Sequence, residues 1–164
     1  MNADETSSPS ARPVRHHLVV VREPYLRDIL AGRKSVECRL SSRARPDFAA
    51  AAAGDWLWLK RPSGPVCGAA RVSAARLVSP AGPDEVRRVA ERYAGQIRAD
   101  RSFWAGTDWV RTIGLFTLEE VLALSRLWVS KFDRRAWVVL PSAPRPHSDR
   151  QRNAEPRPLG SGFP

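Results

Sequence analysis

Short hydrophobic stretches separated by turn residues recur along the chain, and most have the length of a strand. Apolar or alternating stretches bounded by glycine, proline and charged residues predict β-strands. The predicted strands are residues 17–21, 35–40, 56–60, 66–78, 111–116 and 136–140. Residues 118–127 remain open, because their composition suits a helix whereas their place between two strands suits a strand.

Two other stretches repeat apolar residues every three or four positions, which predicts amphipathic helices. The first begins at Pro24 and ends before Gly32. The second begins at Asp84, a candidate N-cap, and runs to Ile97. Residues 102–104 are expected to form a short helical turn. Because strands outnumber helices and do not alternate regularly with them, we expect an α+β fold, a compact β-barrel with peripheral helices.

The two ends of the chain differ from the middle in composition. Residues 1–15 hold almost no large apolar side chain, and residues 141–164 contain six prolines. Such segments bury too little apolar area to offset the entropy lost on ordering. We therefore expect both ends to be disordered and residues 16–140 to form one domain.

The charge of the chain points to an anionic partner. Basic residues number 27 and acidic residues 17, which gives a net charge of +10, and most of the excess lies in residues 16–140. The high ratio of arginine to lysine can reflect base composition of the gene, but the excess of basic over acidic residues cannot. Nucleic acid is the commonest anionic partner of such a protein.

Several classes of protein do not fit this sequence. No apolar run approaches the roughly 20 residues of a membrane span, and the acidic N-terminus does not resemble a secretory signal. The two cysteines, Cys38 and Cys67, are too few for a zinc site and read as structural thiols. We expect no metal, no cofactor and a cytoplasmic location.

The densest cluster of reactive side chains lies where the first helix ends and the second strand begins. Strand alternation divides residues 35–40 into an apolar face, Val36, Cys38 and Leu40, and a polar face, Ser35, Glu37 and Arg39. The backbones of Glu37 and Arg39 are then about 7 Å apart on the same face, so the two can pair or converge on a ligand. A solvated edge strand would have the same pattern, and spacing alone leaves both interpretations open.

A family resemblance favours the ligand site. The residues that carry it are, in order, Glu23-Pro24-Tyr25, then Gly32, Lys34, Glu37 and Arg39, then Gly54-Asp55 before a hydrophobic strand. This stretch resembles the start of an ASCH domain, a branch of the PUA-like superfamily, whose signature has glycine, lysine, often glutamate, and arginine at these spacings. Residues 130–140 resemble the end of one bacterial ASCH subgroup. The resemblance implies a PUA-like β-barrel with flanking helices, association with RNA, and a cleft lined by the signature residues.

The resemblance and the charge together favour RNA or a modified nucleoside within it as the ligand. The candidate binding residues are Tyr25, Arg33, Lys34, Ser35, Glu37, Arg39, Ser130 and Lys131. Lys34 and Arg39 can neutralise a phosphate, and Glu37 can accept a hydrogen bond from a base or a ribose hydroxyl. We expect the Glu37 carboxylate to favour the charged forms of its two cationic neighbours.

Two alternatives remain. Some ASCH proteins are hydrolases, either amidohydrolases on acylated cytidine or ribonucleases. Such an activity would use Lys34, desolvated so that its pKa falls, with Glu37 or Ser130 assisting. Glu37 stands where the amidohydrolases have a threonine, which argues against that activity. The second alternative is a small-ligand or protein-interaction module whose charge reflects composition alone.

The tryptophans add a further expectation. Trp56 and Trp58 share one strand face, as a base-stacking platform would, but such pairs more often lie in a core. We expect at least one of them, and also Trp137, to be core residues. Tyr25 is the better candidate for stacking on a base, because its hydroxyl requires a polar neighbour.

Overall fold

The computed structural model describes residues 12–129 and 134–145 of the chain. Six strands form one sheet: β1 (His16–Val20), β2 (Val36–Ser41), β3 (Trp56–Lys60), β4 (Val66–Val78), β5 (Thr112–Leu127) and β6 (Trp137–Leu140). The helices are α1 (Tyr25–Leu30), α2 (Pro83–Arg92) and α3 (Ala94–Ile97), with 3-10 turns η1 (Asp47–Ala50) and η2 (Arg101–Trp104).

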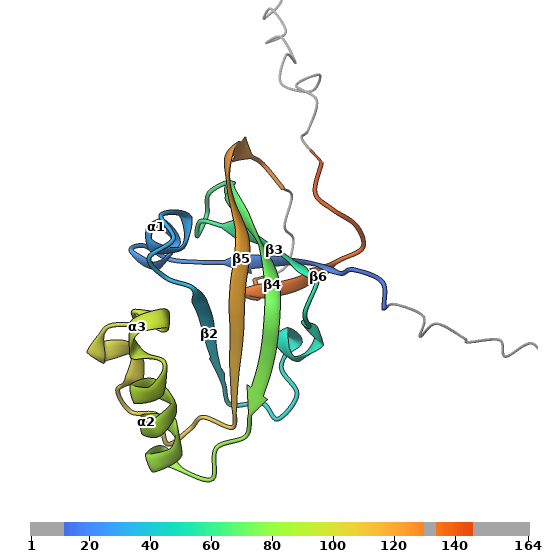
Figure 1. The fold of residues 1–164 in the computed structure, drawn as a ribbon. Helices are drawn as coiled ribbons and strands as arrows, with labels where there is room; N and C mark the ends of the chain where they lie inside the picture. The colour runs from blue at the N-terminus through green and yellow to red at the C-terminus, as the bar shows by residue number, and fades with distance from the viewer. Residues whose placement is uncertain (1–11, 130–133, 146–164) are drawn as a thin grey trace, which may run out of the picture.

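The strands follow the order β2-β5-β4-β3-β1-β6. Strand β1 pairs with β3 in parallel, and all the other neighbours are antiparallel. In Figure 1 the long strands β4 and β5 run from top to bottom, whereas β1 and β6 run from side to side, so the sheet twists and curls strongly. Helices α2 and α3 lie beside β2, and α1 lies near one end of β5 (Figure 1).

The curl brings the two ends of the strand order close together. Arg39 on β2 donates a hydrogen bond from its guanidinium to the carbonyl of Val20 at the end of β1, at 2.8 Å. The same guanidinium lies 5.6 Å from the centre of the Trp137 ring on β6. Strands that are far apart in the sheet therefore meet through one side chain, and the sheet forms a partly closed barrel.

The predicted elements are confirmed with few changes. Residues 118–127, which the sequence left open, continue β5 as a strand. The predicted helix over 84–97 is wrong in two respects, because it divides at Tyr93 into α2 and α3 and because Asp84 is not its cap. Gly82 is the N-cap and Pro83 occupies the first turn, where its missing N–H costs nothing. Asp84 lies within that turn, where a carboxylate interacts favourably with the helix dipole.

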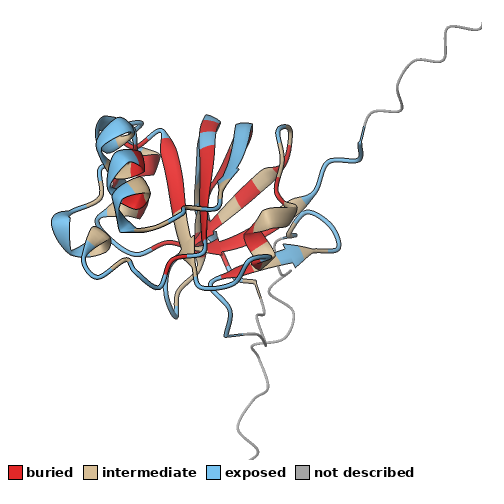
Figure 2. Cartoon of the chain, turned by 90° about the horizontal axis from the view of Figure 1, so that it is seen from below, coloured by how far each residue is buried: buried red, intermediate tan, exposed pale blue. Residues whose placement is uncertain are grey.

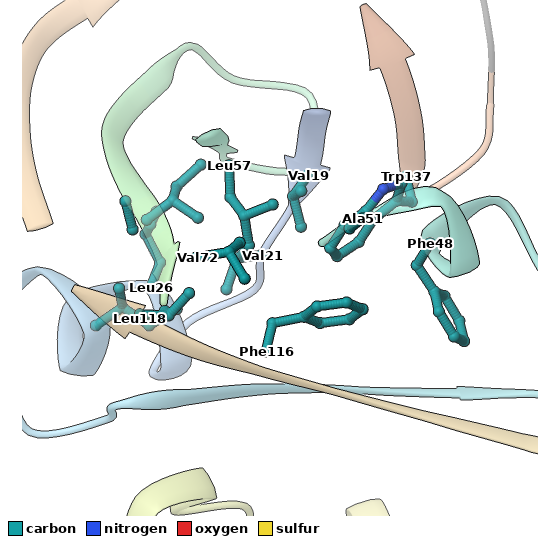
Figure 3. Close-up of a cluster of buried hydrophobic side chains, with 13 residues drawn as sticks. Val19, Val21, Leu26, Phe48, Ala51, Leu57, Val72, Phe116, Leu118 and Trp137 are labelled. Atoms are coloured by element: carbon teal, nitrogen blue, oxygen red, sulfur yellow. The ribbon is translucent and has the colours of Figure 1, made fainter. Parts of the chain in front are cut away.

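The main core fills the inside of the curled sheet. Phe116 contributes the largest fully buried side chain, and its ring lies 4.9 Å from the Trp137 ring between ring centres. Figure 3 shows these two rings with Phe48 of η1 and with Leu57 of β3. Trp137 is 4% exposed, which confirms the prediction that it is a core residue.

The prediction for the tryptophans of β3 was wrong. Trp56 and Trp58 are both only half-buried, whereas Leu57 and Leu59, the residues of opposite parity, are fully buried in the main core. Trp58 packs instead against a small cluster on the outer face, and its indole N–H donates to His16 at 3.1 Å. The leucines fit the crowded inside of the curl, and the rings remain where their edges reach solvent.

A second cluster lies between the helices and the sheet. Val86 and Val89 of α2 and Ile97 of α3 pack with Val36 and Cys38 of β2. Figure 2 shows that the helices bury one side against the sheet and expose the other. Strand β2 is thus covered on its apolar face, and its polar face turns toward the inside of the curl.

Candidate functional site

A cavity of about 660 Å³ lies where β2, α1, the α3–η2 segment and the start of β6 meet. Its lining includes the predicted cluster of Lys34, Glu37 and Arg39, together with Tyr25. The polar face of β2 is therefore the wall of a cavity and not a solvated edge, and Glu37 is only 4% exposed. We refer to this space below as the cavity.

The turn before β2 is built around Asp28. Gly32 adopts a left-handed backbone conformation with φ of 71°, which favours glycine. The carbonyl of Asp28 then accepts hydrogen bonds from the backbone N–H groups of Arg33 and Lys34, at 2.8 and 3.0 Å. The Asp28 carboxylate accepts two more from the Arg33 guanidinium, which lower the pKa of Asp28. The signature glycine and this aspartate together direct Lys34 inward.

Lys34 is buried, and its amine is bonded to other groups of the protein. Its Nζ donates to the carbonyls of Val36 and Ile97, both at 2.7 Å, and lies 3.6 Å from Oε2 of Glu37. Burial lowers the pKa of Lys34, and the nearby Glu37 carboxylate opposes that shift without cancelling it. Glu37 thus favours the charged form of Lys34 as expected, but desolvation has the larger effect on the pKa at this depth. Lys34 ties β2 to α3.

Glu37 and Arg39 form a close ion pair on the cavity wall. Oε1 of Glu37 accepts from the Arg39 guanidinium at 2.8 Å. A guanidinium carries five N–H donors, and Nε of Arg39 is the buried side-chain polar atom without a partner among the described residues. The protein therefore fixes Arg39 through Glu37, Val20 and Trp137 without satisfying the whole guanidinium.

Aromatic rings form a further part of the cavity wall, next to the charged cluster, since Nζ of Lys34 lies 5.7 Å from the centre of the Tyr25 ring. Tyr25 is half-buried and packs edge-on to Phe103 of η2, with 6.4 Å between ring centres, and Trp109 is a further wall residue that is 50% exposed. Burial raises the pKa of Tyr25, whose hydroxyl interacts with Asp100. The Asp100 carboxylate also accepts from the Ser102 hydroxyl at 2.6 Å, which lowers its pKa.

The charge of the cavity lining is positive. Among the described residues, its cations are Arg22, Lys34, Arg39 and Arg134, and its carboxylate is Glu37. Cys38 also borders the cavity, but burial raises the pKa of its thiol to about 12, so that it is not a thiolate nucleophile near neutral pH. The lining thus combines flat apolar surfaces with an excess of positive charge.

The structure brings together four of the eight predicted binding residues. Tyr25, Lys34, Glu37 and Arg39 line the cavity. Arg33 is exposed and pairs with Asp28, and the backbone of Ser35 bonds to Gln96 and Leu118, so neither belongs to the lining. Ser130 and Lys131 lie outside the described residues. A binding role for these four stays a prediction.

The sequence did not predict the wall residues that come from distant segments. Arg22, Ser102, Phe103 and Arg134 lie in short turns or irregular chain, and no spacing rule connects them with the signature.

A series of buried hydrogen bonds next to the cavity was also not predicted from the sequence. The Trp137 indole N–H donates to Nδ1 of His17, and Nε2 of His17 lies 3.1 Å from the Asp55 carboxylate. Because Nδ1 accepts, Nε2 carries the proton and the ring is neutral. Burial lowers the pKa of His17, which also favours the neutral ring. The Trp137 ring in turn packs against the Arg39 guanidinium, so this series of contacts ends at the cavity wall.

The described residues hold no cluster of three or more histidine, cysteine, aspartate or glutamate side chains that could bind a metal. No helix among them is long and apolar enough to cross a membrane.

The similarity of this chain to known proteins is a similarity of structure. No family model and no curated protein matches the sequence. The solved structure of ASCH from Zymomonas mobilis aligns with a TM-score of 0.50 and 19% identity, covering 66% of this chain and 69% of that chain. A serine-to-alanine variant of the Zymomonas mobilis protein aligns with a TM-score of 0.52 and 19% identity, covering 68% and 72%. The curled six-stranded sheet with few helices is therefore an α+β fold of the PUA-like ASCH type, as the sequence resemblance implied.

Proposed function

We propose that this protein binds single-stranded RNA by taking one nucleotide into the cavity. The observation that carries the proposal is the composition of the lining, in which the described residues combine aromatic rings with four cations and one carboxylate. A ligand that matches it has a flat ring to stack and a negative charge to neutralise. A nucleotide has both, and single-stranded RNA is commonly bound through unstacked bases on aromatic side chains.

The size of the cavity supports the same ligand. Small-molecule sites span roughly 300 to 1,000 Å³, and the cavity has about 660 Å³. The base stacks on Tyr25 or on Phe103, whose rings are nearly perpendicular, and the phosphate meets Arg39, Arg22 or Arg134. Glu37 holds Arg39 in place and has remaining lone pairs for a base N–H or a ribose hydroxyl.

The hydrolase alternative has less support from the same geometry. Two of the Lys34 donors are bonded to backbone carbonyls, so the amine would have to leave them before acting as a nucleophile. An ammonium group satisfies these acceptors and Glu37 at once, because it carries three donors. Lys34 is thereby suited to a positioning role in a binding site.

Titration with ribonucleoside monophosphates and with the matching nucleosides tests the proposal. Binding is followed by tryptophan fluorescence, since Trp109 lines the cavity. We expect each nucleotide to bind at least about tenfold more tightly than its nucleoside, which is the free energy of about one charge-assisted contact. Arg39→Gln should narrow that gap, and Tyr25→Leu should weaken nucleotide and nucleoside alike.

The controls separate the alternatives. Arg45→Gln removes an exposed charge outside the cavity and should leave both affinities unchanged. Equal affinities for nucleotide and nucleoside, or no saturable binding of either, would contradict the proposal. Cleavage of an RNA oligonucleotide or of an acylated cytidine by the purified protein would favour the hydrolase instead.

A further inference from the structure

A second concave site lies between α2 and the sheet, away from the cavity. It has a volume of about 180 Å³, and we call it the α2 cleft. Its residues are Arg76, Val78, Glu85, Arg88, Val89, Arg92, Tyr93 and Leu115. Arg88 and Arg92 are four apart on α2 and therefore share one face of the helix, and Arg76 comes from the facing strand β4.

Three guanidinium groups gather here without a counter-ion. Among the described residues, none of Arg76, Arg88 and Arg92 forms an ion pair with a carboxylate. The acid of the cleft, Glu85, uses its carboxylate to accept from the backbone N–H of Ala81 at 2.8 Å.

The surroundings of these arginines hold them near one another. A guanidinium nitrogen of Arg76 lies 3.5 Å from the Tyr93 hydroxyl, and Arg92 lies 6.0 Å from the centre of the Tyr93 ring. Val78, Val89 and Leu115 provide an apolar floor, because Val89 and Leu115 belong to the cluster under the helix. Tyr93 thus links the strand arginine to a helix arginine at the rim.

We propose that the α2 cleft binds backbone phosphates of the same single-stranded RNA whose nucleotide occupies the cavity. The inference rests on the proposed function for its ligand and on the unpaired arginines for its location. Like charges placed together repel one another, and a phosphate between them replaces this repulsion with charge-assisted hydrogen bonds. Arginine suits this task because its planar fork matches phosphate oxygens. Residues 97–103 of the helical region border the cavity and residues 85–93 border the cleft, so consecutive parts of one helical region contribute to both sites.

The test compares two ligands and two triple variants. The ligands are a dinucleotide and an RNA of about 16 nucleotides, a length in the range of single-strand binding sites. The first variant carries Arg76→Gln, Arg88→Gln and Arg92→Gln. The control carries Arg45→Gln, Arg87→Gln and Arg126→Gln, which removes the same charge from exposed positions outside the cleft and the cavity. Affinity is measured by fluorescence anisotropy from about 50 to about 200 mM salt, and thermal unfolding verifies that both variants fold.

The expected result is specific to the long RNA. Each lost phosphate contact lowers the slope of log affinity against log salt by about 0.7 for single strands, so the cleft variant should lose about 2. The control should keep the parental slope, and dinucleotide binding should be the same in all three proteins.

Other outcomes separate this inference from the proposed function. If the dinucleotide does not bind but the long RNA still depends on the three arginines, the cavity proposal fails and the cleft is supported. The cleft inference is overturned if both triple variants have equal slopes, or if the parent binds phosphatidylglycerol vesicles through these arginines and does not bind the long RNA.

Discussion

Lys34 is a predicted binding residue whose amine makes its hydrogen bonds within the fold. Its amine joins β2 to the carbonyl of Ile97, which is 63 residues away in the chain. It also lies within 3.6 Å of Glu37, so the buried charge has a partner. This contact therefore helps to position the α3–η2 wall relative to β2, together with the backbone hydrogen bond from Ser35 to Gln96.

We predict that Lys34→Met destabilises the protein strongly. Removing one member of a buried pair leaves uncompensated polar groups and costs about 3 kcal/mol or more. Urea unfolding of the variant and the parent measures the loss. Arg33→Met is the matched control, because Arg33 is exposed and its pair with Asp28 is worth about 1 kcal/mol or less. Equal loss in the two variants would contradict a bracing role for Lys34.

His17 predicts a pH dependence whose sign follows from its environment. Burial lowers the pKa of His17 in the folded state below the usual 6.5, while the unfolded chain keeps the usual value. As the pH falls below about 6.5, the unfolded state binds a proton that the folded state resists, so stability is lost. The groups that face His17 are Asp55, Arg12 and Arg15. Burial would raise the pKa of Asp55, but hydrogen bonds from Arg12, backbone N–H groups and His17 lower it overall, so this carboxyl stays charged in the window.

The measurement is the free energy of unfolding between about pH 5 and pH 8, the range in which histidine titrates. The parent should be stable and level above pH 6.5 and should lose stability toward pH 5. His17→Gln keeps a donor and an acceptor and should have a flatter profile, whatever its stability at neutral pH. Parallel profiles for the two proteins would show that His17 does not cause the dependence.

Among the secondary-structure elements, those with a strong local pattern were predictable and those fixed by distant contacts were not. Residues 56–60 and 66–78 were predicted with the bounds that β3 and β4 have. Residues 118–127 carry no strict alternation, and they form a strand because β4 pairs with them over most of their length. The Glu37–Arg39 pair followed from strand spacing, whereas Phe103 and Arg134 joined the cavity through tertiary packing alone.

Close packing between elements gives a further prediction at Gly68 of β4. A Cβ at this position would lie 2.7 Å from the carbonyl oxygen of Leu122 on β5 and would also overlap the Leu30 side chain of α1. Backbone cannot move aside as a flexible side chain can, so Gly68→Ala should cost about 1 to 3 kcal/mol. Gly95→Ala in α3 meets nothing within 4 Å and should stabilise by up to about 1 kcal/mol. Thermal unfolding of the two variants gives the comparison, and a neutral Gly68→Ala would show that β4 can shift away from the Leu122 carbonyl of β5.

For the molecule as a whole, the segment before β1 is tied to the sheet through Asp55. The Asp55 carboxylate is fully buried and accepts from the Arg12 guanidinium at 2.6 Å and from the backbone N–H of Arg15 at 2.9 Å. It also bonds to His17 and to the backbone N–H of Ala52. The contacts of this one carboxylate therefore extend from residue 12 to the loop before β3.

The N-terminal boundary of the domain can be tested with two truncations. We propose that residues 16–140 form the domain, and the composition of residues 1–11 gives them no core to contribute, so their deletion should leave thermal unfolding unchanged. Deletion of residues 1–14 also removes Arg12, which leaves the buried Asp55 carboxylate with one charge-assisted hydrogen bond fewer. Arg12 is 37% exposed, so we expect a loss of about 1 kcal/mol, or a fall in melting temperature of about 2 to 4 °C. Arg12→Gln in the full chain should reproduce most of that fall, because it removes the charge and keeps the backbone. Equal melting temperatures of the two truncated proteins would show that Arg12 does not stabilise Asp55. If deletion of residues 1–11 alone lowers the melting temperature, the domain begins earlier than its composition indicates.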